Sequence, residues 1–479
     1  MTLKQRILAL FEDSAFRAPV LKLLSGTGIA FVIAYVAQIA LLRIYPDEYW
    51  GIADYVTAWV SILAPVASLR YEDALMLPED RRRSAHAFLL SVSAVLIFCT
   101  GLLLLLSLSS TVMGYFEGKG GQWMLILPMA ILANRLAKIS ELWLSRQESF
   151  GRISVAQVVQ AGSMVSVRLG AGLLGPGPGG LIWGYVVGFG LSTISMLTRV
   201  ITTLQESLRG LPSLAEMGRI AVRYRRFPQF TMPAAMISGL ITRLPILFIP
   251  EFFGMAVLGQ YSRGFSILFV PLSLLAASIA QVFFVRAVEA NRAGGLSSFT
   301  GNVHARLVLM AFWPTAVLMV AGGDIFTTLF GDAWRDGASY LRYVGPWILL
   351  TVVASPLTRL FDVLERQRLE LFITLLSLFV IGGALLLGGE QGDIRTLLLF
   401  LGIGGAVVRF GQIVWLLTLA GCPVRTMIAP YIRYILIGAP LLAGVWMVSQ
   451  LELPLLTTAA GAIGGLAFLA IILHREKLI

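Results

Sequence analysis

Residues 85–108 read AHAFLLSVSAVLIFCTGLLLLLSL, and the three arginines Arg81, Arg82 and Arg83 precede them. A helix over this stretch is about 36 Å long, which is enough to cross a hydrocarbon core of roughly 30 Å. Fourteen such apolar stretches follow one another between Leu21 and Leu473. The sequence therefore predicts an all-α polytopic membrane protein with about 14 transmembrane helices.

The composition agrees with this prediction and leaves little room for anything else. Of the 479 residues, 57% are hydrophobic and only 13% are charged, about half the charged fraction of a soluble domain. No sizeable extramembrane domain fits between the spans. The predicted helices cover residues 20–42, 51–76, 85–108, 123–144, 153–174, 180–203, 230–249, 257–285, 303–327, 340–361, 369–388, 394–420, 427–449 and 453–473.

The positive charges alternate between the gaps that separate these helices. Four arginines, Arg168, Arg243, Arg263 and Arg409, are set apart, and every other Lys or Arg that lies within a predicted helix is counted with the nearer gap. On this count the N-terminus, the even-numbered loops and the C-terminus hold 28 of the 37 Lys and Arg, and the odd-numbered loops hold five. Loops rich in Lys and Arg stay in the cytoplasm, so both termini are predicted to be cytoplasmic. The net charge of +11 follows this topology, which excludes nucleic acid as a partner.

A weak internal sequence repeat divides the chain into two halves. Leu144-Ser-Arg-Gln147 closes the fourth predicted helix and Leu364-Glu-Arg-Gln367 closes the tenth, a shift of six helices that preserves topology. We expect two six-helix bundles related by a pseudo-two-fold axis along the membrane normal, followed by two further helices. The expected parts are an N-terminal bundle at 1–203, a basic cytoplasmic linker at 204–229, a C-terminal bundle at 230–420 and two transmembrane helices at 421–479.

Four arginines inside predicted spans are the most informative side chains. Each costs about 2.5–3.5 kcal/mol at the bilayer centre if it faces lipid, so each must face something polar. One interpretation is a cationic cavity that holds an anionic substrate, because guanidinium binds phosphate through two parallel hydrogen bonds. The other is snorkelling or pairing with helix carbonyls. The four are Arg168, Arg243, Arg263 and Arg409.

Polar stripes accompany these arginines on single helical faces. Gln157, Gln160 and Met164 share a face with Arg168, while Asp54, Ser61 and Glu72 belong to a stripe on the second predicted helix. Such stripes either line an aqueous path or act as polar contacts between packed helices. Charged residues near the predicted cytoplasmic helix ends are candidates for gating: Arg70, Glu72, Lys138, Glu141 and Asp362. Lys138 and Glu141 are spaced to neutralise each other.

Catalysis, metal binding and cofactor binding find no support in the sequence. His86 and His304 lie near predicted cytoplasmic helix ends and His474 lies in the tail, so no histidine at mid-bilayer depth can act as a base. The two cysteines, Cys99 and Cys422, form no metal-binding spacing. The chain is predicted not to be an enzyme.

The N-terminal part resembles the oligosaccharide flippases of the Wzx type. The resemblance rests on Leu23-Leu-Ser-Gly-Thr27, Arg43-Ile-Tyr-Pro-Asp-Glu-Tyr-Trp-Gly51 and Ser68-Leu-Arg-Tyr-Glu-Asp-Ala-Leu-Met-Leu-Pro-Glu-Asp80. Asp73 departs from the apolar residue expected there. The resemblance implies the superfamily that also holds multidrug antiporters and lipid II flippases. It further implies a bacterial inner-membrane protein that moves undecaprenyl-pyrophosphate-linked repeat units for O-antigen or exopolysaccharide to the periplasmic leaflet, using cationic residues in a cavity between two lobes.

Three functions are therefore weighed. A lipid-linked oligosaccharide flippase is the leading hypothesis. Its expected partners are membrane lipids, a polysaccharide polymerase and a chain-length regulator. A cation-coupled multidrug antiporter of the same fold is the alternative, although it needs buried carboxylates where this sequence has arginines. A membrane polymerase or acyltransferase would need an intramembrane histidine or a large periplasmic loop, which the sequence lacks.

Overall fold

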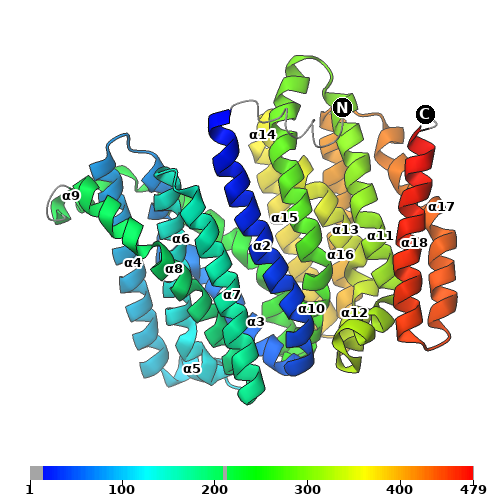
Figure 1. The fold of residues 1–479 in the computed structure, drawn as a ribbon, viewed down its shortest axis with the longest axis horizontal. Coiled ribbons are helices and arrows are strands. Elements are labelled where there is room, and N and C mark those ends of the chain that lie inside the picture. Colours follow the sequence, from blue (N-terminus) through cyan, green and yellow to red (C-terminus); the bar gives the residue numbers. More distant parts are fainter. Residues whose placement is uncertain (1–13, 209–212, 478–479) are drawn as a thin grey trace. The chain divides into compact units, whose positions relative to one another are not determined.

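The computed structural model describes residues 14–208 and 213–477, and every regular element within them is helical (Figure 1). Among these residues, twelve helices are long and apolar enough to cross a membrane. The prediction of an all-α polytopic membrane fold is thus confirmed.

The helices in chain order have the following bounds. The first group is α2 (Ser14–Ile44), α3 (Asp47–Ala67), η1 (Tyr71–Met76), α4 (Arg81–Leu108), α5 (Ser110–Tyr115), η2 (Gly121–Ile126), α6 (Leu127–Arg146), α7 (Phe150–Leu174), α8 (Pro178–Leu208), α9 (Leu214–Arg223) and η3 (Phe227–Thr231). The second group is α10 (Met232–Arg292), α11 (Leu296–Phe330), η4 (Asp332–Trp334), α12 (Arg335–Ser339), α13 (Leu341–Leu357), α14 (Leu360–Val363), α15 (Gln367–Gly389), α16 (Ile394–Leu419), α17 (Val424–Ser449) and α18 (Pro454–Lys477).

Two details reconcile twelve helices with the fourteen predicted. The 61-residue α10 is broken at Gly254, whose φ of 81° and ψ of 177° are not helical, so it supplies two of the predicted helices. Glycine suits this break because it lacks the Cβ that makes a positive φ costly. The 25-residue α7 is not among the twelve, and it carries Arg152, Gln157, Gln160 and Arg168. Each of the fourteen predicted helices corresponds to one observed segment.

The second predicted helix, 51–76, is wrong at its C-terminal end. The α-helix ends at Ala67, because Leu69 and Arg70 adopt the left-handed conformation with φ of 52° and 57°. The chain then forms the separate 3₁₀ turn η1. Glu72 therefore does not continue the stripe of Asp54 and Ser61 on one helix, as the sequence suggested.

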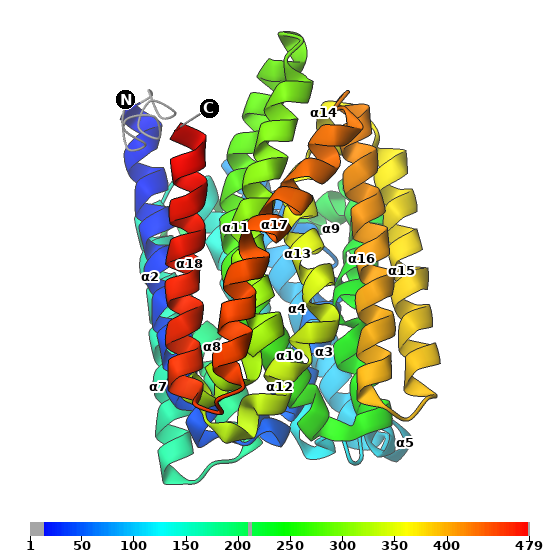
Figure 2. The ribbon, with the colours of Figure 1, turned by 90° about the vertical axis from the view of Figure 1, so that its right-hand side faces the viewer.

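The chain divides into two compact units. Among the described residues, the first unit comprises the chain up to Tyr45 and between Ile52 and Arg243, and the second comprises Pro46–Gly51 and the chain from Leu244 onwards. In the first unit α7 packs against both α2 and α8, and in the second α15 lies beside α16 and α17 beside α18 (Figure 2). The four parts predicted from the sequence, including the linker at 204–229, stay a prediction.

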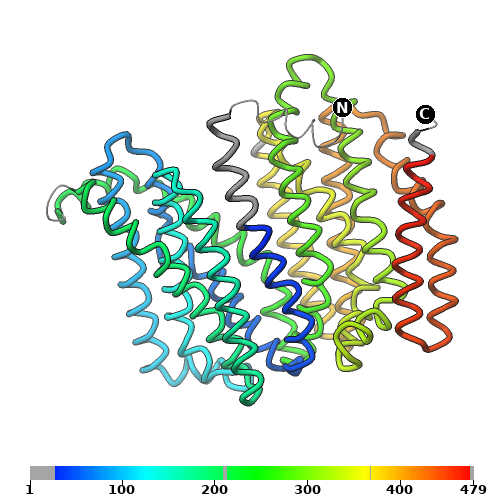
Figure 3. The backbone as a smooth tube through the Cα atoms, viewed as in Figure 1, coloured from blue at the N-terminus to red at the C-terminus, as the bar shows by residue number. Residues whose placement is uncertain are grey.

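The repeated Leu-x-Arg-Gln motif does not align the two turns that follow α6 and α14. After α6 the left-handed residue is Glu148, and the Ser149 amide donates to the Leu144 carbonyl. Figure 3 traces the backbone path, with the chain coloured by residue number. After α14 the left-handed residue is Glu365, and the Arg366 amide donates to the Phe361 carbonyl. The two turns share one geometry. Their equivalent residues are offset by three positions from the Leu-x-Arg-Gln match.

Candidate functional site

A chain of polar contacts crosses the interior of the first unit. Glu72 in η1 is 1% exposed, and its Oε1 lies 3.2 Å from Arg135 Nη1 of α6. The same guanidinium donates to Asn134 Oδ1, and Asn134 Nδ2 donates to the Tyr185 hydroxyl of α8 over 2.9 Å. Buried charges and amides persist in an apolar bundle only where they are paired in this way. We call these four residues the α6 network.

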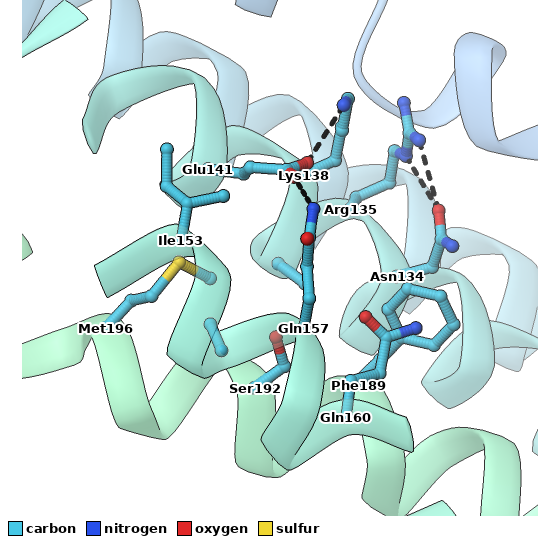
Figure 4. A pocket seen from close by; sticks show the side chains of 12 residues that line it. Asn134, Arg135, Lys138, Glu141, Ile153, Gln157, Gln160, Phe189, Ser192 and Met196 are labelled. Carbon is cyan, nitrogen blue, oxygen red and sulfur yellow. Dashed lines mark hydrogen bonds and ion pairs between the residues drawn. The ribbon is translucent and has the colours of Figure 1, made fainter. Parts of the chain in front are cut away.

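A cavity of about 130 Å³ lies beside this network, between α6, α7 and α8 (Figure 4). Its polar lining includes Asn134, Arg135, Lys138 and Glu141 from α6 and Gln157 and Gln160 from α7, with Ser192 from α8. The cavity has room for several water molecules, and its walls offer the polar partners that water needs. Polar side chains on three helices thus meet at one small hollow, which we call the α6 pocket.

Hydrogen bonds tie the walls of the α6 pocket together. Lys138 Nζ lies 2.9 Å from Glu141 Oε2, which confirms the predicted pairing. Gln157 Nε2 donates to Glu141 Oε1 over 3.1 Å, and the Thr27 hydroxyl of α2 donates to Gln157 Oε1 over 2.7 Å. Figure 4 shows the contacts of Glu141 with Lys138 and Gln157. Thr27 closes the first of the three segments that carry the family resemblance.

Arg168 lies on the same helix as the pocket glutamines but about 12 Å further along it than Gln160. Its Nε donates to the Leu181 carbonyl of α8 over 3.2 Å. A Cβ at Gly184 would lie 2.5 Å from Arg168 Cγ, so the glycine makes room for the arginine side chain. Arg168 thus pairs with a helix carbonyl, one of the two interpretations left open by the sequence.

Tyr185 relates Arg168 to two other cations of the first unit. Tyr185 is half-buried, and Arg135, Arg243 and Arg168 are close enough to its hydroxyl to influence it electrostatically. Arg243, on the first arm of α10, is itself half-buried. Guanidinium groups from α6, α7 and α10 therefore lie within electrostatic range of one tyrosine of the first unit.

The remaining candidates from the sequence lie elsewhere. In the second unit Arg263 stacks over the Trp50 ring, 4.5 Å from its centroid, and Arg409 Nη1 donates to Gln412 Oε1 over 2.7 Å. In the first unit the Ser61 hydroxyl donates to the Thr57 carbonyl of its own helix, and Asp54, about two turns before Ser61, is half-buried. None of these residues lines the α6 pocket.

The candidates for gating form ion pairs near helix ends. Arg70 pairs with Asp73 over 2.9 Å and lies 4.0 Å from Glu72, so the unexpected Asp73 has a partner. Asp362 pairs with Arg359 over 3.5 Å, and both of these side chains are exposed. Only Lys138 and Glu141 of this group line the pocket.

Sequence reasoning missed Arg135 and Tyr185 as site residues. The predicted helix 123–144 contains Arg135, but its charge had been counted with the adjoining cytoplasmic loop; in the structure it lies inside α6 with a side chain that is 12% exposed. The available signal was its position, eight residues from the start of a predominantly apolar helix. Arg168 was selected on the same ground, that an arginine inside an apolar span must face something polar. Tyr185 gave no signal, because tyrosine is ordinary in membrane helices.

Comparisons with known proteins bear on the whole chain. The sequence model of a family described as "Polysaccharide biosynthesis protein" matches residues 40–339. No curated protein matches the chain in sequence.

Solved structures share the fold at low identity. A structure of the lipid II flippase MurJ in an inward closed conformation is 12% identical, with a TM-score of 0.63 over 98% of this chain and 100% of that one. An inward-facing MATE family multidrug transporter of the MOP superfamily is 14% identical, with a TM-score of 0.62 over 84% and 98%. A MOP superfamily transporter from Pyrococcus furiosus is 13% identical, with a TM-score of 0.55 over 84% and 95%. The fold is therefore that of MurJ and the MATE transporters.

Proposed function

The chain belongs to the polysaccharide biosynthesis protein family, and from this premise we propose that it is a lipid-linked oligosaccharide flippase. It moves undecaprenyl-pyrophosphate-linked repeat units from the cytoplasmic to the periplasmic leaflet of the bacterial inner membrane, with both of its own termini in the cytoplasm. The fold, shared with transporters, supports translocation without a chemical step.

The observation that carries this proposal is the cationic interior of the first unit. Arg168 and Arg243 are half-buried on α7 and α10, and Arg135 is 12% exposed on α6, where it contacts Glu72. Guanidinium keeps its charge at physiological pH and binds phosphate oxygens in pairs, so this arrangement suits a pyrophosphate better than a neutral or cationic substrate. The lipid tail would remain in the bilayer while the headgroup is held. That Arg263 and Arg409 also contact the headgroup stays a prediction.

The amides of the α6 pocket suit the sugar that follows the pyrophosphate. Gln157 and Gln160 each offer both a donor and an acceptor, which is what hydroxyl groups require. At about 130 Å³ the pocket holds water or a single small group rather than a repeat unit. In our proposal it forms one polar wall of the path and widens as the two compact units rock during alternating access.

The alternative is a cation-coupled multidrug antiporter of the same fold. Such a transporter needs a carboxylate that is available to a cation. Glu72 is paired with Arg135, and Glu141 is paired with Lys138 and bonded to Gln157. The carboxylates nearest the candidate site are therefore already neutralised, which favours the flippase. An enzymatic function, such as polymerase or acyltransferase, agrees less well with a transporter fold.

A deletion strain complemented with variants tests the flippase. Without the gene, lipid-linked oligosaccharide accumulates in the cytoplasmic leaflet and surface polymer disappears. The double variant Glu72→Gln/Arg135→Gln removes both charges and so leaves no unpaired buried ion, which would otherwise destabilise the bundle by about 3–5 kcal/mol. We expect this variant to fold and insert but to restore export at least tenfold less well than the natural chain.

A matched control removes an ion pair that has no place in the site. Arg286 and Glu289 form an exposed pair over 2.9 Å on α10, and Arg286→Gln/Glu289→Gln should export normally. Deletion without accumulation of the lipid-linked precursor would refute the flippase. Full export by the Glu72/Arg135 double variant would instead remove the α6 network from the mechanism.

A further inference from the structure

The helix α9 is docked on the first unit by one face. Ile220 is 5% exposed, and the Tyr71 hydroxyl donates to the Ala221 carbonyl over 3.2 Å. Glu216 Oε2 lies 3.1 Å from Nε2 of the fully buried His86 and 3.5 Å from Arg82 Nε, both on the first turns of α4. A short helix with several specific anchors holds a defined orientation, so its other face is presented consistently.

The outward face of α9 combines exposed apolar and basic side chains. Leu214 is 82% exposed and Val222 is 66% exposed, and they lie two turns apart. Arg219 and Arg223 are also exposed, but helical spacing places them beside Val222 at the other edge of the exposed surface, away from Leu214. Among the described residues neither arginine pairs with a carboxylate. Large exposed apolar groups beside basic ones on a short helix are typical of contact with a membrane surface.

A cavity of about 470 Å³ lies between this helix and the start of α4. Its charged lining consists of Arg82, Arg83, Arg219 and Arg223, opposed only by Asp80 and Glu216. Arg82 pairs with Glu216 and Arg83 lies 4.0 Å from Asp80, which leaves a surplus of positive charge from Arg219 and Arg223. Arg82 and Arg83 also occupy the first turn of α4, where the helix dipole disfavours cations.

We propose that this cavity binds the phosphate group of an anionic phospholipid. The headgroup occupies the cavity between Arg82, Arg83, Arg219 and Arg223, while Val222, which lines the same cavity, contacts the start of the acyl chains. An anionic phospholipid accounts for all three features. Its phosphate neutralises the excess positive charge and stabilises the arginines at the helix start, and its acyl chains cover the exposed apolar side chain. The site lies on α4 and α9, apart from the α6 network, and does not depend on which substrate is transported.

The test uses the full-length protein in phosphatidylcholine nanodiscs. Dioleoyl phosphatidylglycerol is titrated in, and binding is followed by native mass spectrometry and by the shift in melting temperature. In separate arms, inorganic phosphate and glycerol phosphate are added instead. The variant Arg219→Gln/Arg223→Gln should weaken phosphatidylglycerol binding about 10- to 30-fold, from roughly 1 kcal/mol for each arginine near an anionic surface.

The control is Arg225→Gln/Arg226→Gln, which removes two exposed charges immediately beyond α9 that do not line the cavity. This variant should bind the lipid like the natural chain, and both variants should melt normally without it. Three results overturn the proposal. The first is unchanged lipid binding by the Arg219/Arg223 variant. The second is an equal loss of binding in the control, which indicates diffuse electrostatic attraction. The third is a full shift in melting temperature with inorganic phosphate alone, which indicates a site for a free anion.

Discussion

Gly51 and Gly259 show how single residues fix helix packing in the second unit. A Cβ at Gly51 would collide with the Met255 carbonyl, and a Cβ at Gly259 would collide with the Asp47 carbonyl. Gln260 strengthens the same contact, because its Nε2 donates to Asp47 Oδ2 over 2.8 Å. The Trp-Gly pair of the family-like segment thus serves close packing, with Trp50 beneath Arg263.

The first prediction concerns this close approach. Gly259→Ala should lower the free energy of unfolding by at least about 1–3 kcal/mol, because backbone atoms must move to admit the methyl group. Melting temperature in detergent measures the effect. Gly411→Ala on α16 is the control, since nothing lies within 4 Å of its added Cβ, and it should be neutral or slightly stabilising. Equal melting of both variants would contradict the geometry.

The second prediction concerns Arg168. Arg168→Ala should reduce export about 10- to 100-fold, which is the loss expected for one charge-assisted bond, while membrane insertion stays intact. Arg168→Lys should restore part of the activity, because lysine keeps the charge but loses the paired geometry. Arg199→Ala, an exposed position on α8, is the control and should export normally. Normal export by Arg168→Ala would assign that side chain a purely structural role.

At the scale of elements, one arginine holds the connection between η1 and α4. The Arg146 guanidinium, at the end of α6, donates to the carbonyls of Leu75, Met76 and Pro78. Glu72 lies in η1, just before this connection, and it contacts Arg135 of the same helix α6. The α6 network is therefore supported by a second arginine on the same helix.

The third prediction tests this support. Arg146→Ala should increase hydrogen exchange in residues 75–80 and destabilise the unit by about 1.5–3 kcal/mol, because charged donors to several carbonyls are lost. Hydrogen-exchange mass spectrometry measures the local effect. Arg152→Ala, exposed near the start of α7, should leave this segment unchanged. Unaltered exchange in the Arg146 variant would show that the segment is held by other contacts.

At the scale of the whole molecule, topology depends on α7. This helix is not among the twelve candidate spans of the described residues, and the predicted topology, with both termini in the cytoplasm, requires it to cross the membrane. The fourth prediction is that a cysteine at Glu148 is labelled from the cytoplasm and a cysteine at Gly177 from the periplasm. Labelling of both from the same side would show that α7 does not cross.

The native cysteines should not interfere with this measurement. Burial raises the pKa of the Cys422 thiol, which reduces its reactive thiolate at neutral pH. Labelling of that site should remain slow at pH 7 and should increase only as the pH rises towards the elevated pKa. Cys99 is buried within α4. Fast labelling of a chain with no added cysteine would contradict this expectation.

The sequence by itself determined the class of fold and the positions of the helices. Apolar stretches as long as residues 85–108 can satisfy their backbone only as helices when lipid is the solvent, so their number and order follow directly from composition. The pairing of Lys138 with Glu141 was equally predictable, because it depends only on local helical spacing.

Only the tertiary structure decided which polar residues meet. Glu72 and Arg135 are 63 residues apart and Asn134 and Tyr185 are 51 apart, and no local period relates such partners. The left-handed turn at Leu69 and Arg70, which a continuous apolar pattern concealed, is what separates Glu72 from the stripe on α3. Long-range pairing depends on how helices pack, and a single sequence carries no direct signal of that packing.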